Sequence, residues 1–483
     1  MQFNSYEFIL FFMPLTVFLY WVIGVKSGVL GAKAIIVIAS IVFYGWNRPE
    51  MLLYLGISIL ITYLFTVWIR RKENGNVFLF AIPIVVNVGL LFYCKYYNFT
   101  VSNINRFLEK PIEIESIILP IGISFYTFQQ IAYIVSIEDG TLKDSNFLDY
   151  LVYILFFPKL LMGPITDPVE FISQINDEDT YRFSAGNIAI GIKLFSLGLI
   201  KKVLLADAFA KAVSWGYANL EQATSMDCLI MVLAYTFEIY FDFSGYSDMA
   251  VGVASLFNIT LPINFDSPYK AVSIRDFWKR WHVSLTRFLT RYVYIPLGGS
   301  RVSNARIYIN TLIVFLISGI WHGANWTFIL WGLLHGLFSC FDRMLDKIEN
   351  KVIKPVRWAC TFCVASILWL LFSAPSVEKF MEILRKAAMF HDVNISDGML
   401  DSFRFVEDGF VFNTLGIGSY MGRIRGVHMI IFIAVAFLIC IIPKNNYRTK
   451  ERLNLGTLVL SAGAFIWGLL CLGSESVFIY NGF

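Results

Sequence analysis

Apolar stretches of membrane-spanning length recur along this chain and constrain its fold more than any other feature. An α-helix needs about 20 mostly apolar residues to cross the hydrocarbon core of a bilayer. The clearest stretches, all free of charged residues, are residues 8–25, 51–69, 76–94, 116–137, 358–377, 426–443 and 453–474. Weaker candidates are residues 34–47, 147–165, 186–206, 228–245 and 249–265. We therefore predict an all-α polytopic membrane protein with about 11 to 14 membrane segments, including re-entrant helices.

The composition agrees with this class of protein and argues against others. Hydrophobic residues make up 57% of the chain and charged residues 15%, whereas an ordinary soluble domain carries about 25% charged residues. The formal net charge of +4 gives no indication of nucleic-acid binding. The seven cysteines lie mostly inside apolar stretches, so we predict neither a disulfide framework nor a metal site. We interpret Cys360 and Cys363, which form a C-x-x-C pair, as packed residues of a helix.

The distribution of basic residues predicts which segments face the cytoplasm. Residues 270–306 carry eight Lys or Arg against one Asp, and residues 342–357 carry five basic against three acidic residues. Both segments therefore belong on the cytoplasmic side. The 35 residues between them, 307–341, carry no charge. We predict that they form two helices that leave the cytoplasmic side and return to it, with a break near residues 319–323.

We predict a single membrane domain over residues 1–483, because the sequence shows neither an internal repeat nor a linker-like tract. With the basic segments inside, counting the spans places the N-terminus outside. Residues 378–425 then form an extracytoplasmic insertion with seven acidic and six basic residues. Residues 426–483 form the C-terminal membrane segments.

Residues 273–292 separate into two faces when they are plotted on a helix at about 100° per residue. The apolar face carries Phe277, Trp278, Trp281, Leu285, Phe288 and Leu289, and the opposite face carries Arg275, Lys279, Arg280, Arg287 and Arg291. We predict one interfacial helix whose basic face meets lipid phosphates or an anionic cytoplasmic substrate. His282 lies at the border of the apolar face, where it is either a structural or a catalytic residue.

His322 lies at the predicted break in the uncharged stretch, between a tryptophan and a glycine. A polar group at membrane depth is costly and indicates a functional site. A neutral imidazole suits a general base, because it accepts a hydroxyl proton near physiological pH. A hydrogen bond between helices explains the same residue equally well. We interpret His335 as a packing residue, and His391 and His428 as solvated residues in or beside the insertion.

Three carboxylates, Glu238, Asp242 and Asp248, border or enter apolar segments. Glu238 and Asp242 are four residues apart and can share one helix face. We predict that these carboxylates pair with lysine or arginine residues from elsewhere in the fold, since a charge at that depth is costly. The nearby serines are not part of a nucleophile elbow, a Walker loop or a dinucleotide fingerprint.

Six motifs follow one another over a little under half of the chain, between residues 119 and 336. They are LPIGISFYTFQQIAYIV at 119–135, FFPKLLMGPI at 156–165, YFDFSGYSDMAVG at 240–252, DFWKRWHVSL at 276–285, YIPLGGSR at 294–301 and GIWHGANWTFILWGLLHG at 319–336. Their order and context resemble the membrane-bound O-acyltransferase family, especially its bacterial branch of alginate and peptidoglycan O-acetyltransferases. The resemblance implies a funnel-like helical fold in which a cytoplasmic acyl thioester reaches a histidine at membrane depth.

The resemblance also implies roles for particular residues. His322 matches the catalytic histidine of the family, and His282 matches its second signature position. Apart from the resemblance, we predict Trp278, Trp281, Trp321 and Asn264 as substrate-binding residues, although aromatic packing explains the three tryptophans equally without a ligand. The implied donor is acetyl-CoA, with no tightly bound cofactor, and the implied partner is an extracytoplasmic protein of the serine-hydrolase type.

The sequence departs from the family pattern near the second histidine motif. Thr290 and Arg291 stand where relatives often have an Arg-Asp pair, and Ile263 replaces an acid. Because the changed sign at Arg291 alters the local field, donor contacts cannot be transferred from the family to these positions.

These observations together predict an acetyltransferase subunit of the bacterial cytoplasmic membrane. It would move an acetyl group from a cytoplasmic thioester across the membrane for O-acetylation of a cell-surface or exported polysaccharide, with His322 as general base. His282 would orient the donor or assist proton transfer. Two alternatives stay open: D-alanyl transfer from a carrier protein to teichoic acid, and proton-coupled transport of a lipid or acyl compound.

Overall fold

The computed structural model describes residues 1–71, 77–115, 117–345, 352–405, 414, 421–472 and 478–479. Over these residues the chain forms helices and no strands, as predicted. Parts of the predicted segments 342–357, 378–425 and 426–483 lie outside the described residues.

Eight helical segments in the described part of the chain are long and apolar enough to cross a membrane. They are Glu7–Gly24, Lys26–Gly45, Met51–Arg71, Leu79–Phe107, Ser225–Ser255, Asn304–His322, Lys354–Ser373 and Ile424–Ile441. The larger count of about 11 to 14 membrane segments depends on shorter helices, and it stays a prediction.

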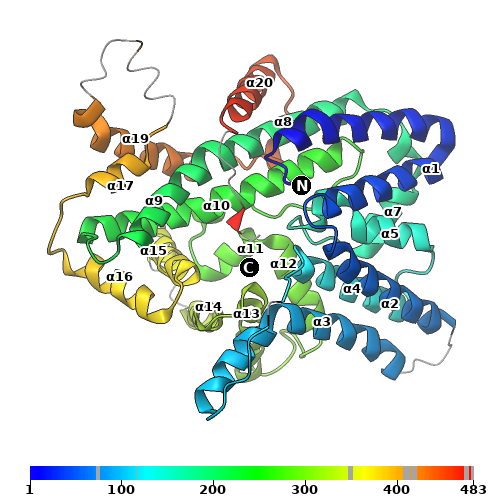
Figure 1. Cartoon of the computed structure of the whole chain (residues 1–483), viewed down its shortest axis with the longest axis horizontal. Helices are drawn as coiled ribbons and strands as arrows, with labels where there is room; N and C mark the ends of the chain where they lie inside the picture. Colours follow the sequence, from blue (N-terminus) through cyan, green and yellow to red (C-terminus); the bar gives the residue numbers. More distant parts are fainter. Residues whose placement is uncertain are drawn as a thin grey trace.

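Figure 1 shows α10 (Ser225–Ser255) crossing the middle of the molecule beside α8 (Ala185–Ile200). To one side lie α1 (Met13–Gly45), α2 (Met51–Arg71), α3 (Val77–Ile104), α4 (Ile123–Glu138), α5 (Phe147–Leu155) and α7 (Pro168–Asn176). To the other side lie α9 (Asp207–Ala218), α15 (Lys354–Ser373), α16 (Val377–Met389), α17 (Asp397–Ser402) and α19 (Met421–Ile441). Between these groups lie α11 (Ile274–Arg280), α12 (Val283–Leu289), α13 (Asn304–His322) and α14 (Trp326–Met344). The short α6 (Phe157–Leu160) follows α5, and α20 (Leu455–Leu470) packs against α8.

The first two apolar stretches form one bent element. A π-helical turn over Glu7–Phe12 leads directly into α1. The helix bends at Gly28, where φ is 68°, a backbone conformation that glycine adopts without the steric cost of a Cβ atom. The bend therefore produces the two spans Glu7–Gly24 and Lys26–Gly45.

The two segments predicted at residues 228–245 and 249–265 are wrong as separate helices. Residues 225–255 form the single helix α10, and the chain after it is not helical until residue 268. The predicted ion pairs explain why charged residues do not end this helix. Lys202 Nζ lies 2.7 Å from an Asp242 oxygen, and Lys201 Nζ lies 2.7 Å from an Asp248 oxygen. Both lysines lie in the π-helical turn Lys201–Ala206 that follows α8. Pairing is thus confirmed for Asp242, and Asp248 pairs in the same way, whereas Glu238 forms no ion pair among the described residues.

Glycines bring the backbones of α8 and α10 into direct contact at two levels. A Cβ atom on Gly198 would lie 2.5 Å from the carbonyl oxygen of Gly245, and one on Gly191 would lie 2.7 Å from that of Gly252. Since such distances are far below van der Waals contact, only glycine fits at these crossing points. The two helices consequently pack with their backbones in direct contact.

The uncharged stretch forms an antiparallel helix pair, as predicted, and its break lies where the sequence indicates. α13 ends at His322, Gly323 is extended, and α14 begins at Trp326 after the N-cap residue Asn325. Gly319 lies against the backbone of α14, where an added Cβ would meet the carbonyl oxygen of Phe328 at 2.4 Å. This close contact fixes the end of α13 relative to α14.

Candidate active site

His282 lies at a break between two short helices, and the prediction of one continuous helix over residues 273–292 is wrong. α11 ends at Arg280, α12 begins at Val283, and a π-helical turn over Thr290–Tyr294 follows. His282 has a left-handed backbone conformation, with φ 44° and ψ 52°. It is not at the border of an apolar face but fully buried. A left-handed histidine costs conformational energy, so tertiary contacts must hold the break in place.

Asn264 supplies those contacts. Its Oδ1 atom lies 3.0 Å from His282 Nδ1 and accepts a hydrogen bond of 2.9 Å from the Ser284 hydroxyl. Its carbonyl oxygen accepts the backbone N–H of Val283 at 3.0 Å, and its Nδ2 donates to Ser247 Oγ at 3.3 Å. The asparagine therefore orients the imidazole of His282. Contact between Asn264 and substrate stays a prediction.

With Nδ1 tied to Asn264, the other ring nitrogen of His282 is the one that can act on a ligand. Within the described residues, Nε2 is buried and has no hydrogen-bond partner. The ring of His282 lies 6.0 Å from that of Trp321, which in turn lies 4.8 Å from that of His322, measured between centroids. The structure thus brings both predicted histidines to one region of the fold, with Trp321 between them.

Aromatic rings from three helices surround His322. Its imidazole makes edge-to-face contacts with Trp331 of α14 and Phe372 of α15, each at 5.1 Å between centroids. His322 and Trp321 also line a small cavity of about 20 Å³ together with Ser124 and Lys95. This volume suffices for about one water molecule. His322 is therefore a buried polar residue at a small polar cavity, with aromatic side chains around it.

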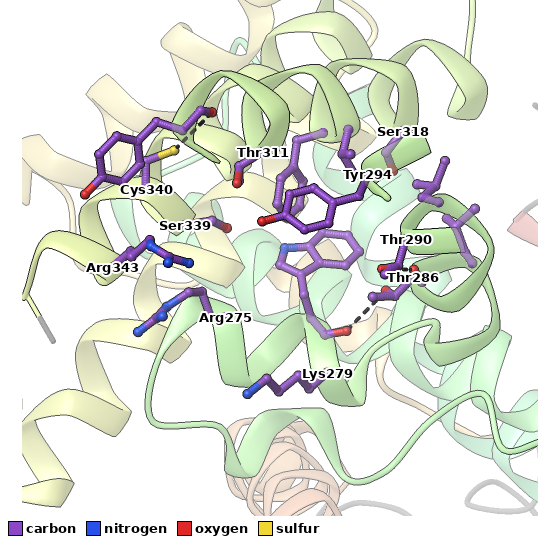
Figure 2. A pocket seen from close by; sticks show the side chains of 16 residues that line it. Arg275, Lys279, Thr286, Thr290, Tyr294, Thr311, Ser318, Ser339, Cys340 and Arg343 are labelled. Atoms are coloured by element: carbon purple, nitrogen blue, oxygen red, sulfur yellow. Dashed lines mark hydrogen bonds between the residues drawn. The ribbon is translucent and has the colours of Figure 1, made fainter. Parts of the chain in front are cut away.

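A larger pocket of about 310 Å³ lies between α11, α12, α13 and α14. Figure 2 shows Arg275, Lys279 and Arg343 on one side of this basic pocket, away from Ser318. Ser318 and His322 are four residues apart on α13, which corresponds to about 6 Å along the helix axis. The basic pocket and the small cavity therefore follow each other along α13.

Two indole rings separate the basic pocket from His322. Trp278 lines the pocket and lies 5.6 Å from Trp331, which contacts His322. The Nε1 atom of Trp278 donates a hydrogen bond of 3.1 Å to Nδ1 of His335. The predicted packing residue His335 is buried and thus also fixes the orientation of this tryptophan.

The other predicted residues occupy different positions. Trp281 is buried against Trp369 and lines neither the basic pocket nor the small cavity. His391 is exposed, and His428 is partly exposed at a distance of 5.9 Å from the ring of Phe405. Substrate contact for Trp281 stays a prediction, although the structure places it in the packed core.

The two cysteines of the C-x-x-C pair do not pack in the interior. Cys360 and Cys363 are both exposed on α15, so our interpretation of them as packed residues is wrong. Neither belongs to a metal-ligating group, since within the described residues no cluster of three or more His, Cys, Asp or Glu side chains could hold a metal ion.

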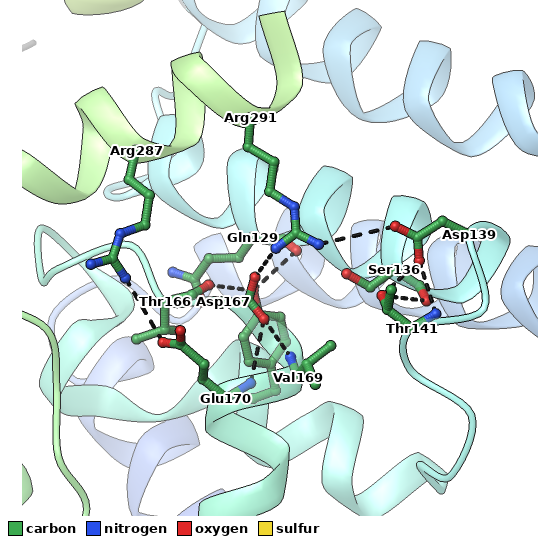
Figure 3. Close-up of polar contacts among 11 residues, drawn as sticks. Gln129, Ser136, Asp139, Thr141, Thr166, Asp167, Val169, Glu170, Arg287 and Arg291 are labelled. Carbon is green, nitrogen blue, oxygen red and sulfur yellow. Dashed lines mark hydrogen bonds and ion pairs between the residues drawn. The ribbon is translucent and has the colours of Figure 1, made fainter. Parts of the chain in front are cut away.

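Some basic residues of the predicted face over residues 273–292 form ion pairs within the chain, and others line the basic pocket. Figure 3 shows Arg291 paired with Asp167 and Asp139, and Arg287 beside Glu170. The unusual positive charge at position 291 is thus matched by acidic residues of this chain. These pairs hold the end of α12 against α4 and α7, whereas Arg275 and Lys279 lie at the basic pocket.

Lys95 is a site residue that the sequence analysis missed. The predicted span 76–94 ends just before it, but α3 continues to Ile104. Its Nζ atom donates to the carbonyl oxygens of Trp321 and His322, at 2.8 and 2.9 Å. Only the neighbouring aromatic residues at 96, 97 and 99 hinted that the apolar helix continues past this charge.

Comparison with known proteins defines the class of this protein. A sequence model of the membrane-bound O-acyltransferase family matches residues 139–381, about half of the chain and all of the region that holds His282 and His322. The chain belongs to the membrane-bound O-acyltransferase family, and it is a multi-pass membrane acyltransferase.

Within this family, the chain is similar to bacterial proteins named for the modification of cell-surface or exported polymers. The chain is 34% identical to the peptidoglycan O-acetyltransferase of Helicobacter pylori, over 100% of this chain and 97% of the relative. It is 36% identical to the probable alginate O-acetylase AlgI of Pseudomonas aeruginosa, over 78% of this chain and 73% of the relative. The teichoic acid D-alanyltransferase of Bacillus subtilis is more distant, with 28% identity over 62% of this chain and 80% of the relative.

Proposed function

We propose that this protein is the membrane subunit that O-acetylates an exported or cell-surface polysaccharide, with acetyl-CoA as the cytoplasmic donor and His322 as the general base. Relatives named for peptidoglycan and alginate O-acetylation support polysaccharide O-acetylation as the general reaction. The observation that carries the proposal is the place of His322 at the end of α13, where it lines the small polar cavity about one helical turn from the basic pocket.

The basic pocket suits the reactive end of a coenzyme A thioester. Its volume of about 310 Å³ lies at the lower end of the range for small-molecule sites, so the acyl-pantetheine arm would enter it. Arg275, Lys279 and Arg343 would hold the anionic phosphates at the mouth. Replacing Lys279 with glutamine should then raise KM for acetyl-CoA more than it lowers kcat.

In the reaction, an acceptor hydroxyl oxygen attacks the carbonyl carbon of the thioester, and His322 takes the hydroxyl proton. The C–S bond then breaks, and the proton passes from His322 to the departing thiolate. Such acid-base assistance contributes about 10² to 10⁴ in rate. His282, held through Nδ1 by Asn264, would orient the thioester through Nε2.

The acceptor of the first transfer would be a hydroxyl of an extracytoplasmic partner of the serine-hydrolase type, which passes the acetyl group to the polysaccharide. This arrangement requires the basic segments 270–306 and 342–357 to face the cytoplasm and the insertion 378–425 to face outward. The bacterial relatives support the inner membrane as the location. Shorter helices such as α4 and α8 would complete about 11 to 14 membrane segments, some of them re-entrant.

The test compares base-released surface acetate in a deletion strain complemented with the native chain, His322→Ala or His391→Ala. Because His391 is an exposed histidine, it controls for loss of a histidine elsewhere in the chain. At equal membrane abundance, we expect acetate with the native chain and with His391→Ala but not with His322→Ala.

Two results would contradict the proposal. Full acetate with His322→Ala would exclude this residue as the general base. Unchanged acetate in the deletion strain, together with loss of surface D-alanine, would replace polysaccharide O-acetylation with the D-alanyl transfer of the more distant relatives.

A further inference from the structure

α13 ends at two buried residues, Trp321 and His322, and the last carbonyl groups of the helix need hydrogen-bond partners. The final carbonyls of any α-helix have no intrahelical donor. After His322 the chain turns at the extended Gly323, so the usual cap by following backbone N–H groups does not form. Without another donor, the backbone that carries the general base would be left unsatisfied at its end.

Lys95 provides the missing donors from a different helix. Its Nζ atom lies 2.8 Å from the Trp321 carbonyl oxygen, 2.9 Å from that of His322 and 3.4 Å from Ser124 Oγ. An ammonium group has three N–H donors, and these three acceptors match them. Lys95 therefore clamps the last turn of α13 to α3 and α4.

Lys95 differs from three lysines of the interior that have acidic partners, and resembles Lys159 and Lys193, which are buried without a carboxylate partner among the described residues. Lys33, Lys201 and Lys202 each pair with an aspartate within 3 Å. Lys95 forms no ion pair with any carboxylate among the described residues, although it lies within the span Leu79–Phe107. A cation at this depth is costly, and a neutral amide could cap two carbonyls. Unlike that of Lys193, the charge of Lys95 lies at the small cavity that His322 lines, so it can serve the site as well as the cap.

We propose that Lys95 is a positioning residue for acyl transfer: it fixes the turn that carries His322 and supplies positive charge to the cavity that both side chains line. Negative charge develops on the thioester oxygen during attack, and a fixed cation nearby stabilises it at no reorganisation cost. Because all three donors of Lys95 are already engaged, it acts through its field and through α13. This inference rests on the proposed function.

The experiment compares Lys95→Gln, Lys95→Met and Lys95→Arg in the full-length chain, assayed in native membranes with acetyl-CoA. Glutamine keeps two N–H donors but has no charge. Methionine has neither donors nor charge, and arginine keeps the donors and the charge. We expect the glutamine and methionine variants to lower kcat by about tenfold or more while KM for acetyl-CoA changes less than about twofold. Arginine should restore most of the rate.

Lys193 offers a matched control. Its Nζ atom also donates to backbone carbonyls, those of Thr449 at 2.8 Å and Arg452 at 2.9 Å, but it lies neither on the basic pocket nor on the small cavity. Lys193→Met should therefore lower protein abundance at most, with an unchanged rate per molecule. Rates are normalised to folded protein measured by thermal denaturation.

The outcomes separate this inference from the proposed function. If Lys95→Gln keeps the rate per molecule of Lys193→Met, or if Lys95→Arg is as slow as Lys95→Met, the role of the charge is refuted. If His322→Ala is inactive in the same assay, the proposed function stands even then. If the native chain itself shows no acetyl-CoA-dependent transfer, the proposed function fails first.

Discussion

Replacing Gly319 with alanine should separate α13 from α14 at the level of the turn that carries His322. Gly319 is three residues before His322, and its added Cβ would meet the Phe328 carbonyl oxygen at 2.4 Å and the Gly332 Cα at 3.1 Å. The first contact is about 1 Å short of the 3.4 Å at which ordinary packing begins. Both neighbours are backbone atoms, so no side-chain rotation relieves the clash.

A displacement of about 1 Å at a reacting group costs about 10² in rate. We therefore expect Gly319→Ala to lower transfer of acetyl groups by roughly 10²-fold while the protein still inserts into the membrane. The measurement is the initial rate of surface O-acetate formation, normalised to the amount of membrane-inserted protein.

Gly336→Ala is the matched control on the same helix pair. Its Cβ would lie 3.1 Å from a Leu312 side-chain atom and 3.2 Å from Phe315 Cβ, and the leucine can move by a few tenths of an ångström. We expect less than about a threefold loss for this variant. Equal rates for the two alanine variants would refute the argument that backbone contact at Gly319 sets the position of His322.

Three further substitutions test other contacts of the site. Asn264→Leu leaves His282 Nδ1 and a serine hydroxyl buried without partners, at a cost of about 1–3 kcal/mol each. Thermal denaturation should therefore show a Tm lower by several degrees, and Asn264→Asp should recover part of the lost stability. Arg291→Met removes a pair that is about two-fifths exposed on the arginine side and contributes about 1 kcal/mol at most, so KM for acetyl-CoA should stay unchanged in steady-state assays. Trp278→Phe deletes the donor to His335 and should raise KM for acetyl-CoA. A double variant in which His335 is also substituted should show no larger increase in KM.

Local sequence features predicted the parts of the site that depend on local forces. The length of the uncharged stretch and its flanking glycines placed the break at His322 correctly. The 3.6-residue periodicity of residues 273–292 identified side chains that are buried in the structure, including Trp278 and Trp281. Both features depend only on neighbouring residues and on the contrast between apolar and polar surroundings, so a single sequence suffices to predict them.

Features that depend on distant partners could not be predicted in this way. The break at His282 has no glycine or proline to indicate it in the sequence. It is held instead by Asn264, 18 residues earlier. Lys95 looked like the end of a span, since its carbonyl partners follow 226 and 227 residues later. The carboxylates of α10 suggested two shorter segments, because the lysines that pair with them lie beyond any local window.

The glycine contacts between α8 and α10 also have a mechanical consequence. The contacts recur seven residues apart on each helix, at Gly191 with Gly252 and at Gly198 with Gly245, and two separated points of backbone contact prevent both sliding and tilting. These two helices therefore move together as one rigid unit. Under the proposed function, any movement that lets an acyl group pass Trp331 would take place relative to this rigid pair, and α13 and α14, which have backbone contacts of their own at Gly319 and Gly332, would move as a second unit.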